Sequence, residues 1–386
     1  MTEARKNSID FALVENGATA GRFIATFWQP IALSRDIGVG RAKRIKMIGE
    51  HYTLFRGEDG TINLVQDRCP HRSTSLAYGT VEGNCIRCCY HGWKFDGADG
   101  HGVEFPAETE AYERAISLRT YPVREYLDTI FAYFGEGDAP EFPTYPELEN
   151  EEDGELLVQA VVLPYNYFQR IENDHDAVHV AFTHPQFATA YGLVGVPKVL
   201  SAKETEFGLR SLSVLPGGRT LGGFGFMPNV LCATVPVQHD KAKLSVHLAW
   251  RVPIDNTSTY SVMINRISSF DEGMRDKSVA AEDPSVIARR VLDGEMHISE
   301  IDHSHPLLPI IQDTVSMLGQ GVIVDRSQEH LGRSDLVIGM LRRLWMREMT
   351  ALEEGKPLKK WRRPEGFDFM AAKDEAQREY DALQTA

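Results

Sequence analysis

Two short stretches of this chain, Cys69-Pro70-His71-Arg72 and Cys88-Cys89-Tyr90-His91-Gly92-Trp93-Lys94-Phe95, decide how its N-terminal part folds. Each stretch places a histidine two or three positions after a cysteine, and sixteen residues separate His71 from Cys88. Two loops that each supply a thiolate and an imidazole can grip one metal centre from opposite sides. The spacing therefore indicates a centre held by Cys69, His71, Cys88 and His91.

This donor set permits two kinds of centre. Two Cys and two His satisfy a tetrahedral zinc ion, but the C-x-x-C spacing that is usual in structural zinc sites is missing. In a [2Fe-2S] cluster of the Rieske type, two Cys hold one iron and two His hold the other, which suits the donors found here. We favour the cluster, with Cys85 and Cys89 as spare thiols in structural roles.

Composition fits a folded protein of two or three domains. The chain has 386 residues, 42% of them hydrophobic, and its 55 acidic and 41 basic residues give a net charge of -14, which argues against broad nucleic-acid binding. Residues 1–30 carry scattered charges, and no apolar run reaches the roughly 18 residues of a membrane span. Four of the five cysteines are clustered, which suggests metal before disulfide. We expect a cytoplasmic protein without a membrane segment.

The hydrophobic pattern predicts an α+β chain. Residues 51–56 and 61–66 are expected to form a hairpin around the turn 57–60, within a small β domain. Residues 135–155, rich in Pro and acidic side chains, have linker character. Alternation over 209–267 indicates an antiparallel sheet, and helical spacing is found in three further segments, at 165–180, 335–350 and 368–383.

A second candidate centre lies in the segment Glu172–Pro185. Non-haem Fe(II) oxygenases bind iron with two His and one carboxylate on one face, and His179 and His184 fit that role. Five residues on a continuous helix rotate by about 140°, and Pro185 disfavours helical geometry at His184. We therefore expect the helix to end between the two histidines. Asp176, three residues before His179, is placed to orient that ligand, while His175 competes as a ligand.

No local spacing identifies the carboxylate ligand. Asp302, Asp313 and Asp325 all lie in the C-terminal third, and each is a possible partner of the two histidines. From the residues alone the three candidates stay open.

Together these motifs resemble the catalytic α subunit of Rieske non-haem iron ring-hydroxylating oxygenases. The tail Gln312-Asp313, Gly319-Gln320-Gly321, Asp325-Arg326-Ser327 and Glu329-His330-Leu331-Gly332 is similar to the phthalate-dioxygenase-type branch. The resemblance implies that Asp313 completes the iron site, and the spacing Asp176-x-x-His179 decides against His175. It also implies that Asp176 links His179 to His91 of the partner subunit in a ring-shaped homotrimer.

The same resemblance implies the fold and the chemistry. We expect a small all-β Rieske domain at 40–150, and a catalytic domain at 1–39 and 151–386 with an antiparallel sheet and packed helices of the helix-grip type. The cofactors would be a [2Fe-2S] cluster and mononuclear Fe(II), with dioxygen as cosubstrate. NAD(P)H would supply electrons through a reductase or ferredoxin.

The expected reaction is hydroxylation of an aromatic or related small organic compound, by ring hydroxylation or by oxidative O- or N-dealkylation. Two alternatives remain, an electron-transfer protein without oxygenase activity and a zinc-stabilised binding protein. Four arginines are candidates for pairing with a substrate carboxylate: Arg210, Arg219, Arg251 and Arg266.

Overall fold

The computed structural model describes residues 10–149, 155–190, 192–236, 244–267, 282–362 and 369–385. Contacts group the chain into two compact units, one of Val14–Pro143 with Val252–Asp255, and one of the remaining residues. The smaller unit begins well before residue 40, because β1 (Trp28–Leu33) pairs with β11 (Thr129–Tyr133). The functional boundaries expected at 40 and 150 stay predictions.

The smaller unit consists of three small sheets. Their strand orders are β1-β11-β10, β2-β3-β4-β9 and β5-β6-β7-β8. The remaining strands are β2 (Arg41–Met47), β3 (Glu50–Arg56), β4 (Ile62–Gln66), β5 (Thr80–Glu82), β6 (Cys85–Arg87), β7 (Lys94–Asp96), β8 (Gly102–Glu104), β9 (Thr120–Tyr121) and β10 (Val123–Tyr126). Two short helices, α1 (Thr19–Ala25) and α2 (Glu110–Ala115), complete it. The predicted hairpin is confirmed as β3 and β4.

One apolar core joins two of these sheets. Phe55 and Val65 from the hairpin pack with Ile86 and Phe95 from the sheet that follows, and all four are fully buried. The side chains of the predicted metal loops belong to the same core, namely Cys69, Cys88 and Trp93. The loops are therefore anchored to the core by hydrophobic burial.

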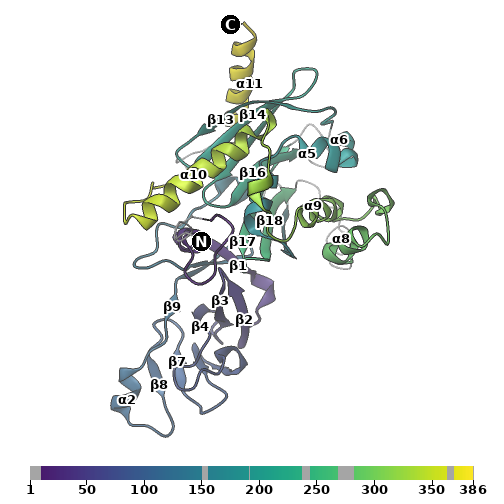
Figure 1. The fold of residues 1–386 in the computed structure, drawn as a ribbon. Coiled ribbons are helices and arrows are strands. Elements are labelled where there is room, and N and C mark those ends of the chain that lie inside the picture. The colour runs from purple at the N-terminus through teal and green to yellow at the C-terminus, as the bar shows by residue number, and fades with distance from the viewer. Residues whose placement is uncertain are drawn as a thin grey trace, which may run out of the picture. The chain divides into compact units, whose positions relative to one another are not determined.

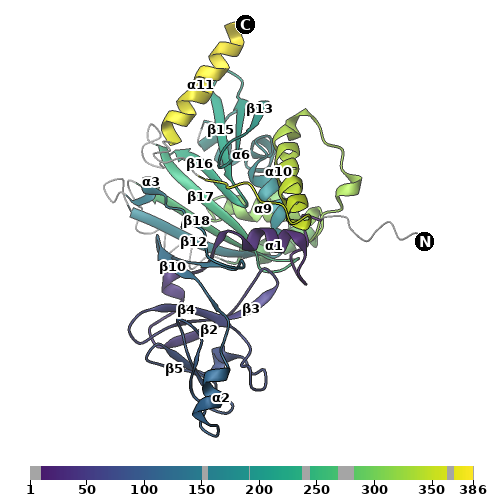
Figure 2. The same ribbon diagram turned by 90° about the vertical axis from the view of Figure 1, so that its left-hand side faces the viewer.

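The larger unit is built on a seven-stranded antiparallel sheet of order β12-β18-β17-β16-β15-β14-β13 (Figures 1 and 2). Its strands are β12 (Glu155–Leu163), β13 (Lys198–Glu204), β14 (Gly208–Val214), β15 (Thr220–Phe226), β16 (Val230–Pro236), β17 (Leu244–Pro253) and β18 (Thr259–Ile267). The described helices are α3 (Pro146–Glu149), α4 (Tyr167–Asp174), α5 (His179–Thr183), α6 (Pro185–Ala190), α8 (Pro284–Leu292), α9 (Leu308–Gly319), α10 (Leu336–Glu353) and α11 (Phe369–Thr385). The α+β prediction is confirmed.

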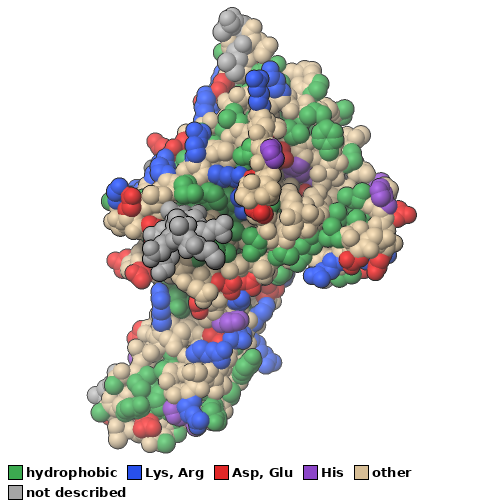
Figure 3. Space-filling view, in the orientation of Figure 1, with side chains coloured by type: hydrophobic (Ala, Val, Ile, Leu, Met, Phe, Trp, Pro, Cys, Tyr) green, Lys and Arg blue, Asp and Glu red, His purple; other side chains and the backbone are tan. Residues whose placement is uncertain are grey.

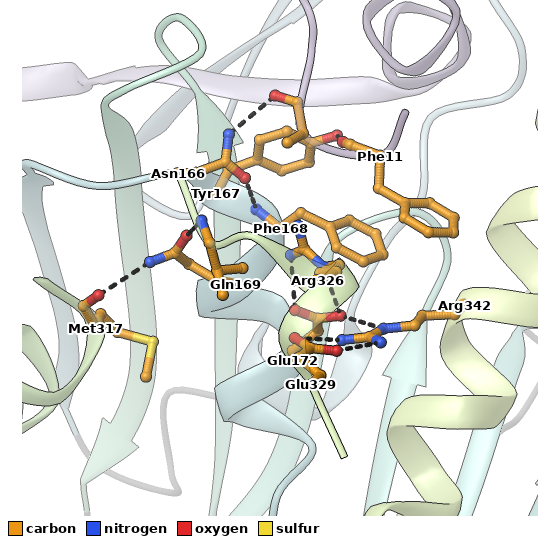
Figure 4. A network of polar contacts seen from close by, with 12 residues as sticks. Phe11, Asn166, Tyr167, Phe168, Gln169, Glu172, Met317, Arg326, Glu329 and Arg342 are labelled. Atoms are coloured by element: carbon orange, nitrogen blue, oxygen red, sulfur yellow. Dashed lines mark hydrogen bonds and ion pairs between the residues drawn. The ribbon is translucent and has the colours of Figure 1, made fainter. Parts of the chain in front are cut away.

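Helix α4 is anchored by side-chain contacts at its start and along its length. Asn166 caps its N-terminus, where its side-chain oxygen accepts a hydrogen bond from the amide of Phe168. Further along, Glu172 accepts hydrogen bonds from Arg326 and Arg342, and Arg342 also pairs with Glu329 (Figure 4). These ion pairs tie α4 to helix α10.

Among the residues that the structure describes, no helix is both long and apolar enough to cross a membrane. On the face shown in Figure 3, acidic and basic side chains are interspersed. The net negative charge is thus not gathered into one patch on that face.

Candidate metal sites

The first candidate site lies on the two loops of the smaller unit. Cys69 and His71 follow β4, and Cys88 to His91 lie between β6 and β7. Each loop is closed by a backbone pair: Cys69 N–H donates to Thr74 O at 2.9 Å, and Cys88 N–H donates to Trp93 O at 2.8 Å. Gly92 makes the second turn possible because its φ is +75°, a value that other residues rarely adopt.

The four predicted donors lie on these two loops. Cys69 and Cys88 are almost fully buried, and the imidazole rings of His71 and His91 have centroids 4.3 Å apart. Trp93 stacks on His71 with an interplanar angle of 7°, as a residue that shields the site from water should. Tyr90 is 54% exposed, and its ring lies against that of His91.

These residues fit an iron–sulfur cluster. His71 Nδ1 is buried without a hydrogen-bond partner in the structure, so its lone pair is available to a metal. Burial raises the pKa of the Cys69 thiol to about 11, so its thiolate forms at neutral pH only against a positive centre such as iron. Desolvation, assisted by His71 and Arg72, lowers the pKa of His91, which favours the neutral imidazole that binds metal.

The second candidate site begins where the predicted helix 165–180 breaks. Helix α4 ends at Asp174, and α5 begins only at His179. The Asp176 carboxylate causes the break, because its Oδ1 accepts hydrogen bonds from the amides of Val178 and His179 at 2.8 and 3.3 Å. Helix α5 then ends at Thr183, so the expected end between the two histidines is confirmed and His184 lies in the turn before α6.

Three side chains from two distant segments converge here. His179, His184 and Asp313 place one donor atom each within 4.8 Å of one another. Asp313 Oδ1 lies 3.0 Å from His184 Nε2 and 3.6 Å from His179 Nε2. Two imidazoles and one carboxylate on one side of a centre form the facial donor set of non-haem iron.

Hydrogen bonds fix the tautomer of both histidines. His184 Nδ1 lies 2.9 Å from Gln312 Oε1, and His179 Nδ1 lies 2.5 Å from the carbonyl oxygen of Asp176. Because both acceptors are oxygens, each Nδ1 carries a hydrogen, and each Nε2 is the ring atom that faces Asp313 and can bind a metal when it carries no proton. Both rings are thus prepared to bind one metal through Nε2.

Asp313 is held as a carboxylate. Burial opposes its ionisation, but the guanidinium of Arg170 and the imidazole of His184 outweigh burial and keep the pKa of Asp313 well below its usual range. The same carboxylate raises the pKa of His184 against the effect of burial. A divalent metal would replace that proton, since metal binding requires the neutral ring.

Comparison with known proteins identifies the family. A model of the Rieske [2Fe-2S] domain matches residues 27–122. The 5,5'-dehydrodivanillate O-demethylase oxygenase subunit of Sphingobium sp. is 29% identical over 92% of this chain and 82% of its own length. The phthalate 4,5-dioxygenase oxygenase subunit of Pseudomonas putida is 25% identical over 89% of this chain and 85% of its own length. The chain belongs to the Rieske non-haem iron oxygenases.

Solved structures agree on the fold. Pseudomonas putida CBB5 NdmA superposes with a TM-score of 0.66 at 19% identity, covering 86% of this oxygenase and 92% of that chain. The fluorene-bound oxygenase and ferredoxin complex of carbazole 1,9a-dioxygenase gives 0.63 at 20% identity, covering 86% and 96%. The Rieske oxygenase described here is thus a terminal oxygenase component with a Rieske [2Fe-2S] domain and a His-His-Asp mononuclear iron site. The family uses dioxygen as cosubstrate and electrons supplied by a reductase.

The competing residues of the oxygenase lie elsewhere. His175 is buried against Gly225, where an added Cβ would lie 2.7 Å from the imidazole ring, and burial lowers the pKa of His175 to about 4. Asp302 is tied to Ser304, and Asp325 caps a short helical turn at Ser327. None of these three belongs to the converging group.

The arginines expected to meet a substrate carboxylate have other partners. Arg210 pairs with Glu379 at 2.6 Å, and Arg219 donates to the carbonyl oxygen of Gly192. Arg251 is buried in an ion pair with Asp174. The side chain of Arg266 lies outside the described residues.

Three residues that sequence reasoning missed surround the iron site. Gln312 Oε1 accepts a hydrogen bond from His184 Nδ1. Arg170 contacts Oδ2 of Asp313, and Asn173 Nδ2 donates a hydrogen bond to Asp313 Oδ1 at 3.3 Å. Asn173 and Arg170 lie on α4 and face inwards because the whole helix is buried. One sequence signal could have indicated Arg170 and Asn173. Both are polar residues on a predicted helix that also carries the apolar residues Phe168 and Ile171.

A second cluster of possible metal donors consists of Asp96, Asp99 and His101, and we do not propose it as a metal site. Its side chains are largely exposed and bond to each other and to their own turn.

Proposed function

We propose that this oxygenase binds its cluster through Cys69, His71, Cys88 and His91, and its catalytic iron through His179, His184 and Asp313. Its reaction is hydroxylation of an aromatic or related small organic substrate, by ring hydroxylation or by O- or N-dealkylation. The observation that carries the proposal is the convergence of Asp313 Oδ1 on the Nε2 atoms of both histidines. The relatives support the substrate class, since their names record an aromatic demethylase and a phthalate dioxygenase.

In this chemistry the protein holds the iron ligands in position and controls the timing of the reaction. When iron is bound, it supplies the activation of dioxygen next to the substrate, with two electrons from the reductase system. Gln312 and the carbonyl of Asp176 keep both imidazoles turned with Nε2 inwards, and α4 supplies Arg170 and Asn173 to hold Asp313. The ligands are therefore arranged before iron arrives, which lowers the cost of forming the site.

Asp176 is proposed as the link in electron transfer. Its Oδ1 accepts hydrogen bonds from two amides in the turn before α5, while its Oδ2 has no partner among the residues that the structure describes. That oxygen can accept a hydrogen bond from an imidazole of another chain, and His91 on the cluster loop is exposed. We assign the link to His91 of the partner subunit in a homotrimer, with a ferredoxin or reductase as the electron donor.

We place this enzyme in the cytoplasm, where reducing conditions keep cysteines as thiols and NAD(P)H-dependent reductases operate. No disulfide joins any of its five cysteines.

A single-turnover assay tests the function. The protein is reduced anaerobically and freed from reductant. It is then mixed with dioxygen and each member of a panel of aromatic acids, aromatic methyl ethers and N-alkyl amides. One class should give a hydroxylated or dealkylated product, with formaldehyde in the case of demethylation, and His184→Ala should give none. Protein with two irons and no product is an electron carrier, and colourless zinc protein is a binding protein; either result refutes the proposal.

A further inference from the structure

Four charged side chains form a buried quartet beside the proposed iron site. They are Arg251 on β17, Arg170 and Asp174 on α4, and Asp313 on α9, and their side chains are 2%, 10%, 4% and 6% exposed. Their formal charges cancel, which is how a folded protein tolerates so many buried ions. The quartet thus runs from the sheet through α4 to the proposed metal ligand.

Asp174 is the fixed centre of this quartet. Arg251 forms two hydrogen bonds with Asp174, from Nε to Oδ2 at 2.6 Å and from Nη2 to Oδ1 at 2.8 Å. It also donates a hydrogen bond to Ser261 Oγ. A two-contact pair between a guanidinium and a carboxylate is rigid as well as strong. Arg170 Nη1 adds a third contact to Asp174 Oδ1 at 2.9 Å. The sheet therefore fixes Asp174, and Asp174 fixes Arg170.

The two oxygens of Asp313 have different surroundings. Oδ1 lies 3.0 Å from His184 Nε2 and 3.3 Å from Asn173 Nδ2, on the side of the imidazoles. Oδ2 lies 3.4 Å from Arg170 Nη2. One oxygen thus faces the proposed metal position and the other faces a guanidinium.

We propose that Arg170 is a positioning residue that restricts Asp313 to one metal-binding oxygen. The guanidinium engages Oδ2 and leaves Oδ1 to the metal, so a coordination position stays open that a two-oxygen carboxylate would fill. The inference rests on the proposed iron site and concerns how its carboxylate binds.

The chemistry of arginine suits this task. A guanidinium stays protonated at any pH that the protein survives and offers donors in a planar fork, so Arg170 can hold Asp174 and Asp313 at once. A lysine in its place would be a single charged point. The arrangement also makes the metal bind less tightly, because a cation lies near the position of a second cation.

The change Arg170→Met tests this directly. Chelator-treated full-length protein that retains its cluster is loaded with Co²⁺. X-ray absorption at the cobalt edge then reports the metal's ligands without interference from the cluster irons. We expect one more oxygen ligand in Arg170→Met than in the wild type, and Co²⁺ affinity tighter by about tenfold, because the guanidinium no longer repels the metal cation. Nitric oxide binding to the ferrous form should weaken, as seen in the electron paramagnetic resonance signal.

Two further variants separate positioning from charge and folding. In Arg170→Met with Asp174→Asn, the net charge of the quartet is unchanged, and the extra oxygen ligand should still be present. Arg326 also pairs with a carboxylate of α4 but does not contact Asp313. The Co²⁺ ligands and affinity of Arg326→Met should therefore match those of the wild type. Cluster absorption and urea unfolding of each variant show whether it is folded.

The outcomes discriminate between the proposals. Tighter Co²⁺ binding with an unchanged number of ligands would mean that Arg170 acts through its charge alone, which overturns the inference. Loss of metal binding in both Arg170 variants overturns it as well. A wild-type protein that binds no Co²⁺ in a one-to-one ratio refutes the proposed iron site itself.

Discussion

Asp313 Oδ1 lies 3.0 Å from His184 Nε2, although 129 positions separate the two residues along the chain. The contact exists because α9 packs against α5, and Arg170 and Asn173 of α4 contact Asp313 from behind. Its geometry depends on hydrogen bonds from residues that would not touch the metal. Several of these bonds can be removed one at a time.

Gln312 should control metal affinity through His184. In Gln312→Leu the Nδ1 hydrogen of His184 loses its acceptor, so the ring is freer to rotate and Nε2 is a weaker donor. We expect iron affinity to fall by about 10- to 100-fold, as is typical for such partners. Competition with a chelator of known affinity measures this. Gln312→Glu retains an acceptor oxygen and should bind iron nearly as the wild type does; equal affinity in the leucine variant would disprove the role.

His175 should make the catalytic unit less stable in mild acid. Burial lowers the pKa of His175 to about 4, against about 6.5 in an unfolded chain. Between these values only the unfolded chain takes up the proton. The contribution is therefore complete above pH 6.5 and falls by up to about 1.4 kcal/mol per pH unit as the pH decreases towards 4.

Urea unfolding at pH 7, 6 and 5 checks this prediction. His175→Phe has a ring that does not titrate, and the free energy of unfolding of this variant should vary less steeply with pH. His247, whose pKa burial also lowers to about 4, contributes with the same sign and remains in both proteins. An identical slope in the variant would show that His175 is protonated in the folded protein.

Glu172 should be worth more to stability than an exposed acid. Its carboxylate accepts from Arg326 at 2.7 Å and from Arg342 at 2.6 Å, and it is 7% exposed. Glu172→Gln leaves two guanidiniums facing a neutral amide, with an expected loss of about 2 to 3 kcal/mol in the free energy of unfolding. The matched change Glu375→Gln, at an exposed carboxylate that pairs with Arg210, should cost less than about 1 kcal/mol. Equal losses in the two variants would refute the structural importance of the network.

Asp176 should control electron transfer without controlling metal content. Asp176→Asn retains the oxygen that accepts from Val178 and His179, so the turn before α5 should be preserved. We expect both metals to remain, and the oxidation of a reduced cluster by dioxygen in the presence of substrate to slow by at least about tenfold, as for other outer-shell changes. Stopped-flow absorption of the cluster follows this step. An unchanged rate would remove Asp176 from the electron route.

The sequence predicts some parts of this molecule because their signals are local. Cys69, His71, Cys88 and His91 stand in two short loops, and the hairpin β3–β4 has its turn residues between alternating strands. The break between His179 and His184 also follows from helical rotation and from Pro185.

Other parts could not be predicted because their causes are remote. The continuous helix expected over 165–180 is wrong, since the Asp176 carboxylate accepts hydrogen bonds from the amides of Val178 and His179 and competes with the helical hydrogen bonds that would have continued from α4. The choice of Asp313 came from resemblance, because only tertiary packing of α9 brings it to α5. The burial of Arg170 could not be foreseen either, because its partner Asp174 is held by Arg251 on a strand 77 positions further along.

The most direct test of the account is the metal and sulfide content of purified protein, compared with the variant His179→Ala/His184→Ala. The wild type should contain about three irons and two sulfides per chain. The variant should contain about two irons and two sulfides, with the visible spectrum of the cluster unchanged. Two irons in both proteins, or zinc in place of iron, would contradict the two-centre oxygenase described here.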